Sequence, residues 1–170
     1  IGTDTGGSGR VPAGLNNIVG LKPTRGLLSA RHMVEACRNL DCISIFALTP
    51  NDAWQVFQVA KGFDPQDPFA RPEGTPSHRL AAGRPFRFGI PRQEQLEFFG
   101  NGDVEQAFEQ AVARLKSLGG ECQEIDYAPF LAANDLLFKG PWVAERYASV
   151  GKFVEANPDS VLATTRDIIL

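Results

Sequence analysis

Cysteine is scarce in this sequence: Cys37, Cys42 and Cys122 are the three among 170 residues. Their number is odd, and no CxxC pair or Cys/His cluster has the spacing of a zinc site. Both a disulfide-stapled secreted scaffold and a structural zinc domain are therefore disfavoured. The pattern favours buried, reduced thiols in a cytosolic protein.

An excess of basic charge and long apolar runs are lacking too. The net charge is −3, and no basic face or recognisable module favours a nucleic-acid partner. The longest apolar candidate, from Ile43 to Leu48, has the length of a strand and cannot cross a bilayer. With 43% hydrophobic and 22% charged residues, the composition is that of a soluble globular domain. We predict a cytoplasmic protein that binds neither nucleic acid nor membrane.

Both ends of the sequence look interrupted. Ile1 leads directly into a glycine-rich loop, and the only methionine, Met33, lies well inside the chain. After Asp167 the sequence ends on the apolar run Ile168-Ile169-Leu170, without a cap or a polar tail. We therefore expect residues 1–170 to be part of a longer domain.

Strand and helix patterns alternate along the chain, which predicts an α/β fold whose strand order stays open. The expected strands are 42–48, 87–90 and 122–127. The expected helices are 11–16, 50–61 with Thr49 as N-cap, 103–118 with an Asp103/Gln106 capping box, and 130–154 with a break at Gly140-Pro141. Residues 64–85 are dense in proline, glycine and charge, and are predicted to form a surface connection within the domain.

The most informative segment runs from Gly2 to Pro12 and reads GTDTGGSGRVP. Glycines let backbone N–H groups approach a ligand closely, and the start of a helix favours negative charge. The loop would suit the oxyanion formed when a serine attacks a carbonyl, and it would equally suit a phosphate. No GxxxxGK[ST] or GxGxxG is present, and Arg10 replaces the last glycine of GxSxG. The spacing alone leaves a plain glycine-rich turn with an incidental serine as an equal alternative.

Two ordered blocks resemble the amidase-signature family. Gly2–Pro12 matches G-T-D-x-G-G-S-x-R-x-P, and Gly20–Gly26 matches G-L-K-P-T-x-G. The resemblance implies the amidase-signature fold, a layered mixed sheet covered by helices. Residues 1–170 would be the C-terminal portion of that domain, following the catalytic lysine. Ser8 takes the position of the nucleophile.

The resemblance also assigns roles within this loop. The backbone N–H groups of Thr5, Gly6 and Gly7 would form an oxyanion hole. Asp4 and Arg10 would brace the loop without transferring protons.

A serine hydroxyl needs a base to become a good nucleophile. In the amidase-signature family a second serine relays the proton to a lysine, a variant of the triad logic, and both precede the GTD block. We therefore expect them upstream of Ile1, and we expect the isolated chain to be inactive. Lys22 falls in a structural block of the family, and neither His32 nor His78 has an evident carboxylate partner, so none of the three is assigned as the base.

Three stretches are similar to the allophanate hydrolases within this family: 36–47, 62–69 and 140–147. Position 9 is glycine, where many family members carry a β-branched residue, and elsewhere in the family the 36–47 region reads more like S-L-D-x-x-G-P. The similarity implies cleavage of allophanate to ammonia and carbon dioxide during urea degradation. It further implies a functional link to a biotin-dependent urea carboxylase, no metal or organic cofactor, and possible assembly as a homodimer.

The similarity places two residues at the substrate. Arg146 would clamp the substrate carboxylate with two parallel hydrogen bonds, whereas spacing alone favours a surface arginine paired with Glu145 or Asp135. Phe138 stands where a tyrosine is expected, so a hydroxyl contact to the substrate is lost there unless another group such as Tyr147 supplies it.

Two alternatives stay open. The first is another amidase-signature amidase, or a subunit resembling the glutamyl-tRNA amidotransferases, with a wider channel and no dependence on Arg146. The second is a non-catalytic module whose loop holds an anion.

Overall fold

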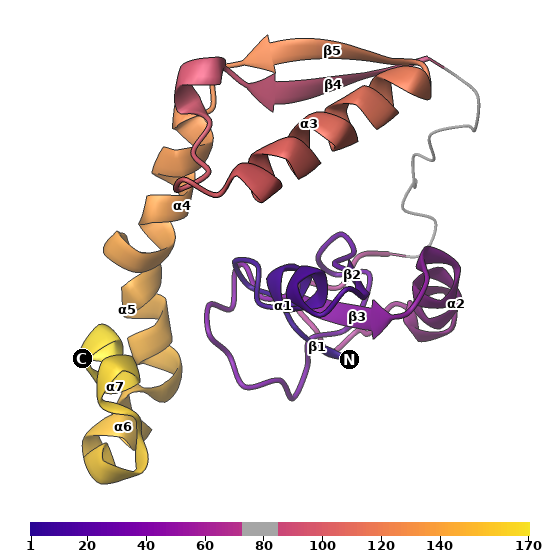
Figure 1. The fold of residues 1–170 in the computed structure, drawn as a ribbon. Helices are drawn as coiled ribbons and strands as arrows, with labels where there is room; N and C mark the ends of the chain where they lie inside the picture. Colours follow the sequence, from indigo (N-terminus) through magenta and orange to yellow (C-terminus); the bar gives the residue numbers. More distant parts are fainter. Residues whose placement is uncertain (73–84) are drawn as a thin grey trace. The chain divides into compact units, whose positions relative to one another are not determined.

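The computed structural model describes residues 1–72 and 85–170, apart from the side chain of Phe138. The chain divides into two compact units, one formed by Ile1–Thr75 with Asn134–Leu170 and the other by Pro76–Ala133. Figure 1 shows the elements of both units. Much of the predicted connection over 64–85, from 73 to 84, lies outside the described residues.

A three-stranded antiparallel sheet lies at the centre of the first unit, in the order β1-β3-β2. Its strands are β1 (Gly2–Thr3), β2 (Val19–Leu21) and β3 (Ile43–Ala47). The helices around it are α1 (Arg10–Leu15) and α2 (Pro50–Ala60). The middle strand, β3, is the apolar run that the sequence predicts as a buried strand, and both of its edges are paired.

The core of this unit forms where α2 packs against β2 and β3. Its buried members are Leu28, Ile45, Ala53 and Phe57. The start of α2 is fixed as predicted, because the Thr49 side chain accepts a hydrogen bond from the Asp52 N–H. Ala53 and Phe57 form the inner face of α2 and Trp54 packs beside them, whereas Val56 and Ala60 are exposed.

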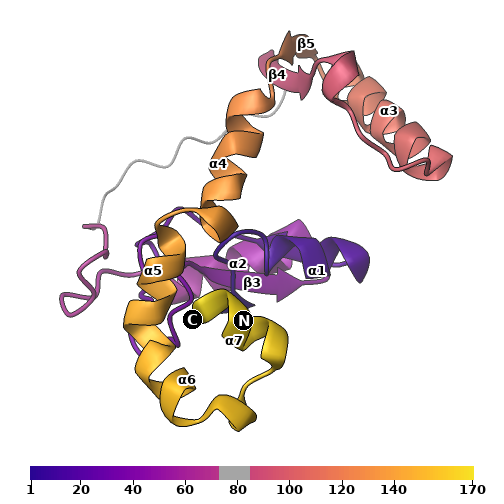
Figure 2. The same ribbon diagram turned by 90° about the vertical axis from the view of Figure 1, so that its left-hand side faces the viewer.

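Helices also complete the first unit at its C-terminal end. They are α4 (Ala128–Lys139), of which the residues from Asn134 onward belong here, α5 (Trp142–Arg146), a π-helix (Tyr147–Gly151), α6 (Lys152–Ala156) and α7 (Ala163–Ile169). The break at Gly140-Pro141 is confirmed. A 3₁₀ turn (Pro158–Ser160) reverses the chain, so that α7 returns alongside α5 (Figure 2).

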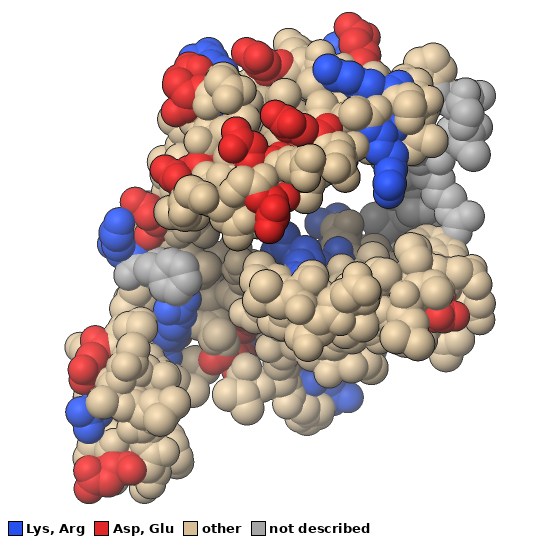
Figure 3. All heavy atoms as spheres, viewed as in Figure 1, with Lys and Arg blue, Asp and Glu red and all other residues tan. Residues whose placement is uncertain are grey.

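The second unit is a parallel strand pair joined by one helix. Its elements are β4 (Phe86–Pro91), a 3₁₀ turn (Gln93–Gln95), α3 (Gly102–Ser117) and β5 (Gly120–Ile125). Acidic side chains gather over α3 and basic ones lie at its C-terminal end, as Figure 3 shows, an order that complements the helix dipole.

The predicted α/β class is confirmed, and one helix start is corrected. Asn101, not Asp103, caps α3, because the Asn101 side chain accepts a hydrogen bond from the Val104 N–H. Asp103 lies in the first helical turn, where its charge still favours the helix dipole. All helices in the described part of the chain are too short or too polar to cross a membrane.

Candidate active site

Ser8 lies in a tight loop between β1 and α1, and it is exposed. The Asp4 N–H donates to the Cys42 carbonyl at 2.8 Å, which continues the pairing of β1 with β3. On the other side, the Val11 N–H donates to the Gly7 carbonyl at 2.8 Å and starts the first helical turn. The loop therefore presents Ser8 between two anchored ends.

The Asp4 carboxylate organises the inside of this loop. Asp4 is fully buried, and its two oxygens accept hydrogen bonds from the Gly7 N–H at 2.7 Å and the Arg10 N–H at 3.0 Å. The Arg10 guanidinium adds two more, from Nε at 2.9 Å and from a terminal nitrogen at 3.1 Å. Lys22 Nζ lies 3.5 Å from the same carboxylate. This geometry supports the bracing role proposed for Asp4 and Arg10.

Burial would by itself raise the pKa of Asp4. The hydrogen bonds from Arg10 and Gly7, with the charge of Lys22, outweigh that effect and hold the pKa well below the ordinary range of a carboxyl group. Asp4 is therefore ionised wherever the protein is folded near neutral pH. It cannot act as a general acid for Ser8.

The third predicted oxyanion donor, the Gly7 N–H, makes a hydrogen bond within the loop. Its hydrogen bond to Asp4 Oδ1 directs it into the loop, and Gly7 has φ +130, a conformation that favours glycine. No backbone hydrogen bond of the Thr5 or Gly6 N–H occurs among the described residues. Thr5 and Gly6 thus stay candidates for the oxyanion hole, whereas Gly7 shapes the turn.

Lys22, which the sequence analysis places in a structural block, and Asp41, which it missed, hold Thr5 in place. Lys22 Nζ donates to the Thr5 carbonyl at 3.1 Å, and the Thr5 hydroxyl donates to Asp41 Oδ1 at 2.5 Å. The carbonyl and the following N–H of a trans peptide point in opposite directions. Lys22 therefore also directs the Gly6 N–H away from itself, towards the outer side of the loop.

Gly9 is required by close packing and not by its backbone conformation. Its φ of −96 and ψ of −50 are open to any residue. A Cβ atom at this position would lie 2.9 Å from the Ser44 Cβ and closer still to the Ser44 hydroxyl. Ser44 is fully buried on β3. The glycine next to the nucleophile thus allows the loop to rest directly on the central strand.

Leu137 of α4 packs against the same loop from another side. A Cβ atom on Gly6 would overlap with the Leu137 side chain, which is buried. The neighbouring Phe138 lies on α4, but its side chain is outside the described part of the structure. The helix that carries Phe138 is therefore in contact with the Ser8 loop.

Arg146 is the last residue of α5 and is half-buried. It lines a cavity of about 300 Å³ together with the 34–36 segment, Val150 and α7, and the lining does not include Ser8. The structure thus brings together the loop residues predicted from the signature motif. It places Arg146 on a separate element of the same unit.

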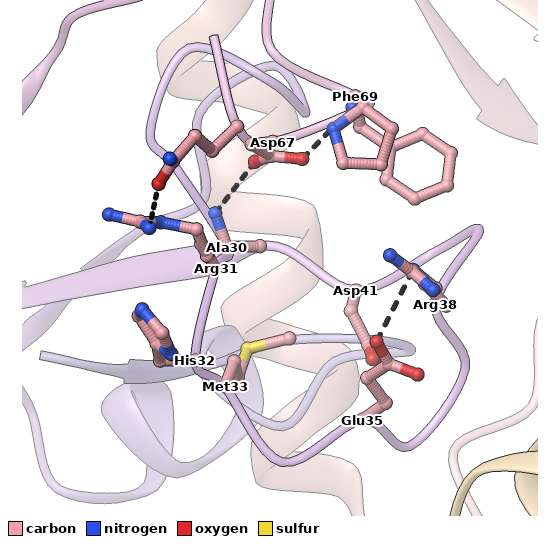
Figure 4. Close-up of a pocket in the computed structure, with 11 residues that line it drawn as sticks. Ala30, Arg31, His32, Met33, Glu35, Arg38, Asp41, Asp67 and Phe69 are labelled. Atoms are coloured by element: carbon pink, nitrogen blue, oxygen red, sulfur yellow. Dashed lines mark hydrogen bonds and ion pairs between the residues drawn. The ribbon is translucent and has the colours of Figure 1, made fainter. Parts of the chain in front are cut away.

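A second cavity, of about 110 Å³, lies among the 30–41 and 66–69 segments (Figure 4). Its charged groups are held by residues of the lining: Arg31 donates to Gln66, Asp67 accepts from the Ala30 N–H at 2.9 Å, and Arg38 pairs with Glu35 at 3.2 Å. His32 lines this cavity and is exposed, whereas His78 lies outside the described residues. Asp41 connects this cavity to Thr5.

Two of the three cysteines are buried thiols, Cys37 and Cys42, and Cys122 is half-buried. Within residues 1–72 and 85–170, no cluster of three or more His, Cys, Asp or Glu side chains has the arrangement of a metal site.

The site therefore consists of an exposed serine on a glycine-rich loop, which the buried Asp4 carboxylate, the exposed Arg10 and the partly buried Lys22 brace. The amidase family model matches residues 1–169, and the chain belongs to this family.

Particular relatives are similar over most of the chain. The urea amidolyase of Lachancea kluyveri is 42% identical over 159 residues, which cover 93% of this chain and 8% of that protein. The structure of a variant of Kluyveromyces lactis allophanate hydrolase is 39% identical with a TM-score of 0.88, and the match covers 99% of this chain and 27% of that one. A glutamyl-tRNA(Gln) amidotransferase subunit of Picosynechococcus sp. is 36% identical over 139 residues, or 76% of this chain and 28% of that protein. The chain therefore spans under a third of each of these proteins.

Proposed function

We propose that this chain provides the nucleophile loop and a substrate-binding helix of an allophanate hydrolase. The enzyme would cleave allophanate (urea-1-carboxylate) to ammonia and carbon dioxide in urea degradation, in the cytoplasm. The observation that carries the proposal is the exposed Ser8, on a loop whose Thr5 and Gly6 N–H groups make no backbone hydrogen bond among the described residues. The similarity to urea amidolyase and allophanate hydrolase supports the choice of substrate.

In the first step, Ser8 Oγ attacks the terminal amide carbon of allophanate. The serine proton passes to a base, which by the family resemblance is a second serine backed by a neutral lysine. The carbonyl oxygen takes up the negative charge and accepts hydrogen bonds from the Thr5 and Gly6 N–H groups. The tetrahedral centre then collapses, and the C–N bond breaks as ammonia leaves with the relayed proton.

In the second step, water attacks the acyl-Ser8 intermediate and restores the serine. The released dicarboxylate, N-carboxycarbamate, loses carbon dioxide to give carbamate. Carbamate then breaks down to the second ammonia and the second carbon dioxide, which completes the breakdown of the ureido compound. A biotin-dependent urea carboxylase would supply the substrate, because it converts urea to urea-1-carboxylate. None of these steps uses a metal or an organic cofactor, and the active form proposed is a homodimer.

Lys22 is assigned to the loop and not to proton transfer. Its amino group donates to the Thr5 carbonyl and lies 3.5 Å from the Asp4 carboxylate, so its contacts are with the backbone and the buried carboxylate of the loop.

Arg146 is proposed to bind the substrate carboxylate. It lines the cavity of about 300 Å³ that the 34–36 segment and α7 border. A guanidinium at the edge of a cavity suits a planar carboxylate, which it can hold with two hydrogen bonds. Phe138 is proposed to contribute its ring to the same site.

The test is ammonia release from allophanate by the full-length protein and by its Ser8→Ala and Arg146→Ala variants. We expect Ser8→Ala to lower kcat by at least about 10³-fold. We expect Arg146→Ala to raise KM about 10- to 100-fold, the size expected for a lost charge-assisted hydrogen-bond pair.

Other outcomes discriminate between the alternatives. Hydrolysis of other amides without activity on allophanate would retain an amidase and refute this substrate. The amidotransferase alternative predicts ammonia release from glutamine without any effect of Arg146→Ala. Inactivity on every amide would favour a module that only binds an anion.

A further inference from the structure

One short turn, residues 36–41, is held by carboxylates on both sides. On the first side, Asp41 Oδ2 accepts hydrogen bonds from the Ala36 N–H at 3.0 Å and the Cys37 N–H at 3.1 Å. Asp41 Oδ1 accepts the Thr5 hydroxyl at 2.5 Å. Asp41 is buried, so this carboxylate fixes the turn to the loop that carries Ser8.

On the other side, the turn is fixed to α5 by Glu145. One Glu145 oxygen accepts hydrogen bonds from Asn39, at 3.2 Å from its N–H and at 2.6 Å from its side-chain amide. The other oxygen accepts the Cys37 thiol at 2.8 Å. Glu145 thus uses both oxygens on the turn that Asp41 connects to Thr5.

The hydrogen bond from the Cys37 thiol to Glu145 persists over a wide pH range because the thiol stays protonated. Cys37 is fully buried, and burial together with the hydrogen bond to Glu145 raises its pKa to about 12. The turn itself is closed by the Leu40 and Asp41 N–H groups, which both donate to the Cys37 carbonyl at 2.8 Å. The path from α5 to the Ser8 loop is therefore short and internally hydrogen-bonded.

Arg146 is the next residue after Glu145. Successive helical residues differ by about 100° around the axis, so fixing Glu145 also fixes the direction in which Arg146 leaves α5. Arg146 borders the same chain segment, because Glu35 and Ala36 line its cavity.

We propose that Glu145 is a positioning residue that, through the 36–41 turn, holds Arg146 at a fixed position relative to the Ser8 loop. The proposal rests on the proposed function, in which Arg146 binds the substrate carboxylate. Glu145 itself touches neither the substrate nor Ser8. It acts by setting the distance between the group that anchors the substrate and the group that attacks it.

The test compares Glu145→Gln, Arg146→Ala and the double variant of the full-length protein. Glu155→Gln is the matched control, since Glu155 is an exposed carboxylate that accepts a hydrogen bond from Tyr147 at 2.7 Å. Each variant is assayed with allophanate and with biuret, in which a neutral amide replaces the carboxylate. Biuret is measured as a substrate or as a competitive inhibitor.

We expect Glu145→Gln to raise KM for allophanate about 10-fold while kcat changes less than about 3-fold, as for lost ground-state binding. Binding of biuret should stay within about 2-fold of the wild type, because biuret lacks the carboxylate whose contact both variants weaken. In the Arg146→Ala background, Glu145→Gln should have no further effect. Two outcomes would overturn the proposal and indicate general structural damage. The first is an equal rise in KM on adding Glu145→Gln to the wild type and to Arg146→Ala, and the second is an equal loss of binding for allophanate and biuret.

A second measurement separates this proposal from the proposed function. Glu145→Gln should speed the modification of Cys37 by an uncharged thiol reagent at least about 10-fold, because a held thiol reacts only when the turn opens. Glu155→Gln should leave that rate unchanged. Inactivity of the wild type on allophanate would refute the proposed function, whereas an unchanged Cys37 rate in Glu145→Gln would refute the link between α5 and the turn.

Discussion

The contact between Gly9 and Ser44 yields a sharp prediction on the geometry of the nucleophile loop. Replacing Gly9 with alanine places a methyl group 2.9 Å from the Ser44 Cβ, 3.1 Å from the Asp4 Cβ and closer still to the Ser44 hydroxyl. Ordinary contacts of this kind begin near 3.4 Å. The strand β3 is paired on both edges, so Ser44 has little room to retreat.

Overpacking of a filled site costs about 1–3 kcal/mol. We expect Gly9→Ala to destabilise the folded protein by that amount. We also expect it to lower kcat, because the displaced residue is the neighbour of Ser8. Ser44→Gly removes both offending atoms, at a cost of about 0.5–1 kcal/mol for a glycine in a strand. In the double variant, Gly9→Ala with Ser44→Gly, the free energy of unfolding should be about 1–2 kcal/mol higher than the sum of the two single losses predicts.

The assay is a double-mutant cycle on the full-length protein, with thermal unfolding and kcat measured for all four members. Ser44→Ala is an internal control: it removes only the hydroxyl, so it should relieve Gly9→Ala in part. Strict additivity of Gly9→Ala and Ser44→Gly would refute the reasoning, since it would mean that the two sites do not compete for the same space.

The remaining predictions concern charge and the thiols. Asp4→Asn should make the free energy of unfolding depend less on pH in the acid range. The pKa of Asp4 is depressed in the folded protein, so the stability that its ionised carboxylate contributes is complete above about pH 4–5 and is lost as the pH falls below that. Urea unfolding of the wild type and the variant at pH 7, 5 and 3 measures this difference. Lys22→Gln should lower kcat about 10-fold with little change in KM, because the Thr5 carbonyl loses its hydrogen bond from Lys22 and the Gly6 N–H loses its fixed orientation. An unchanged kcat would contradict this role of Lys22. Iodoacetamide at pH 8.5 should modify Cys122 before Cys37, whose pKa burial raises to about 12; mass spectrometry of timed digests would read the order.

Local signals in the sequence were sufficient for most of the elements. Thr49 and Pro50 specify the start of α2 because capping depends on neighbouring residues, and Gly140-Pro141 breaks the helical stretch for the same reason. Where two polar residues compete for one cap, as Asn101 and Asp103 do, the pattern cannot choose between them.

The support of the site was less predictable. Asp4 and Arg10 stand in the signature motif itself, whereas Asp41 lies 36 residues from Thr5 and Glu145 lies 108 residues from Cys37. Contacts over such separations leave no periodic or local pattern.

The π-helix after Arg146 determines which changes in length this segment can absorb. Residues 147–151 follow a wider path than an α-helix, and the buried Gly151 lies under the Tyr147 ring with no room for a Cβ atom. A π turn holds about one residue more than an α turn, so deleting one residue here would give an ordinary α turn and leave α6 in nearly the same orientation. An added residue, or a second deletion, would instead turn everything that follows by about 100°. The segment should therefore tolerate the loss of one residue better than the gain of one.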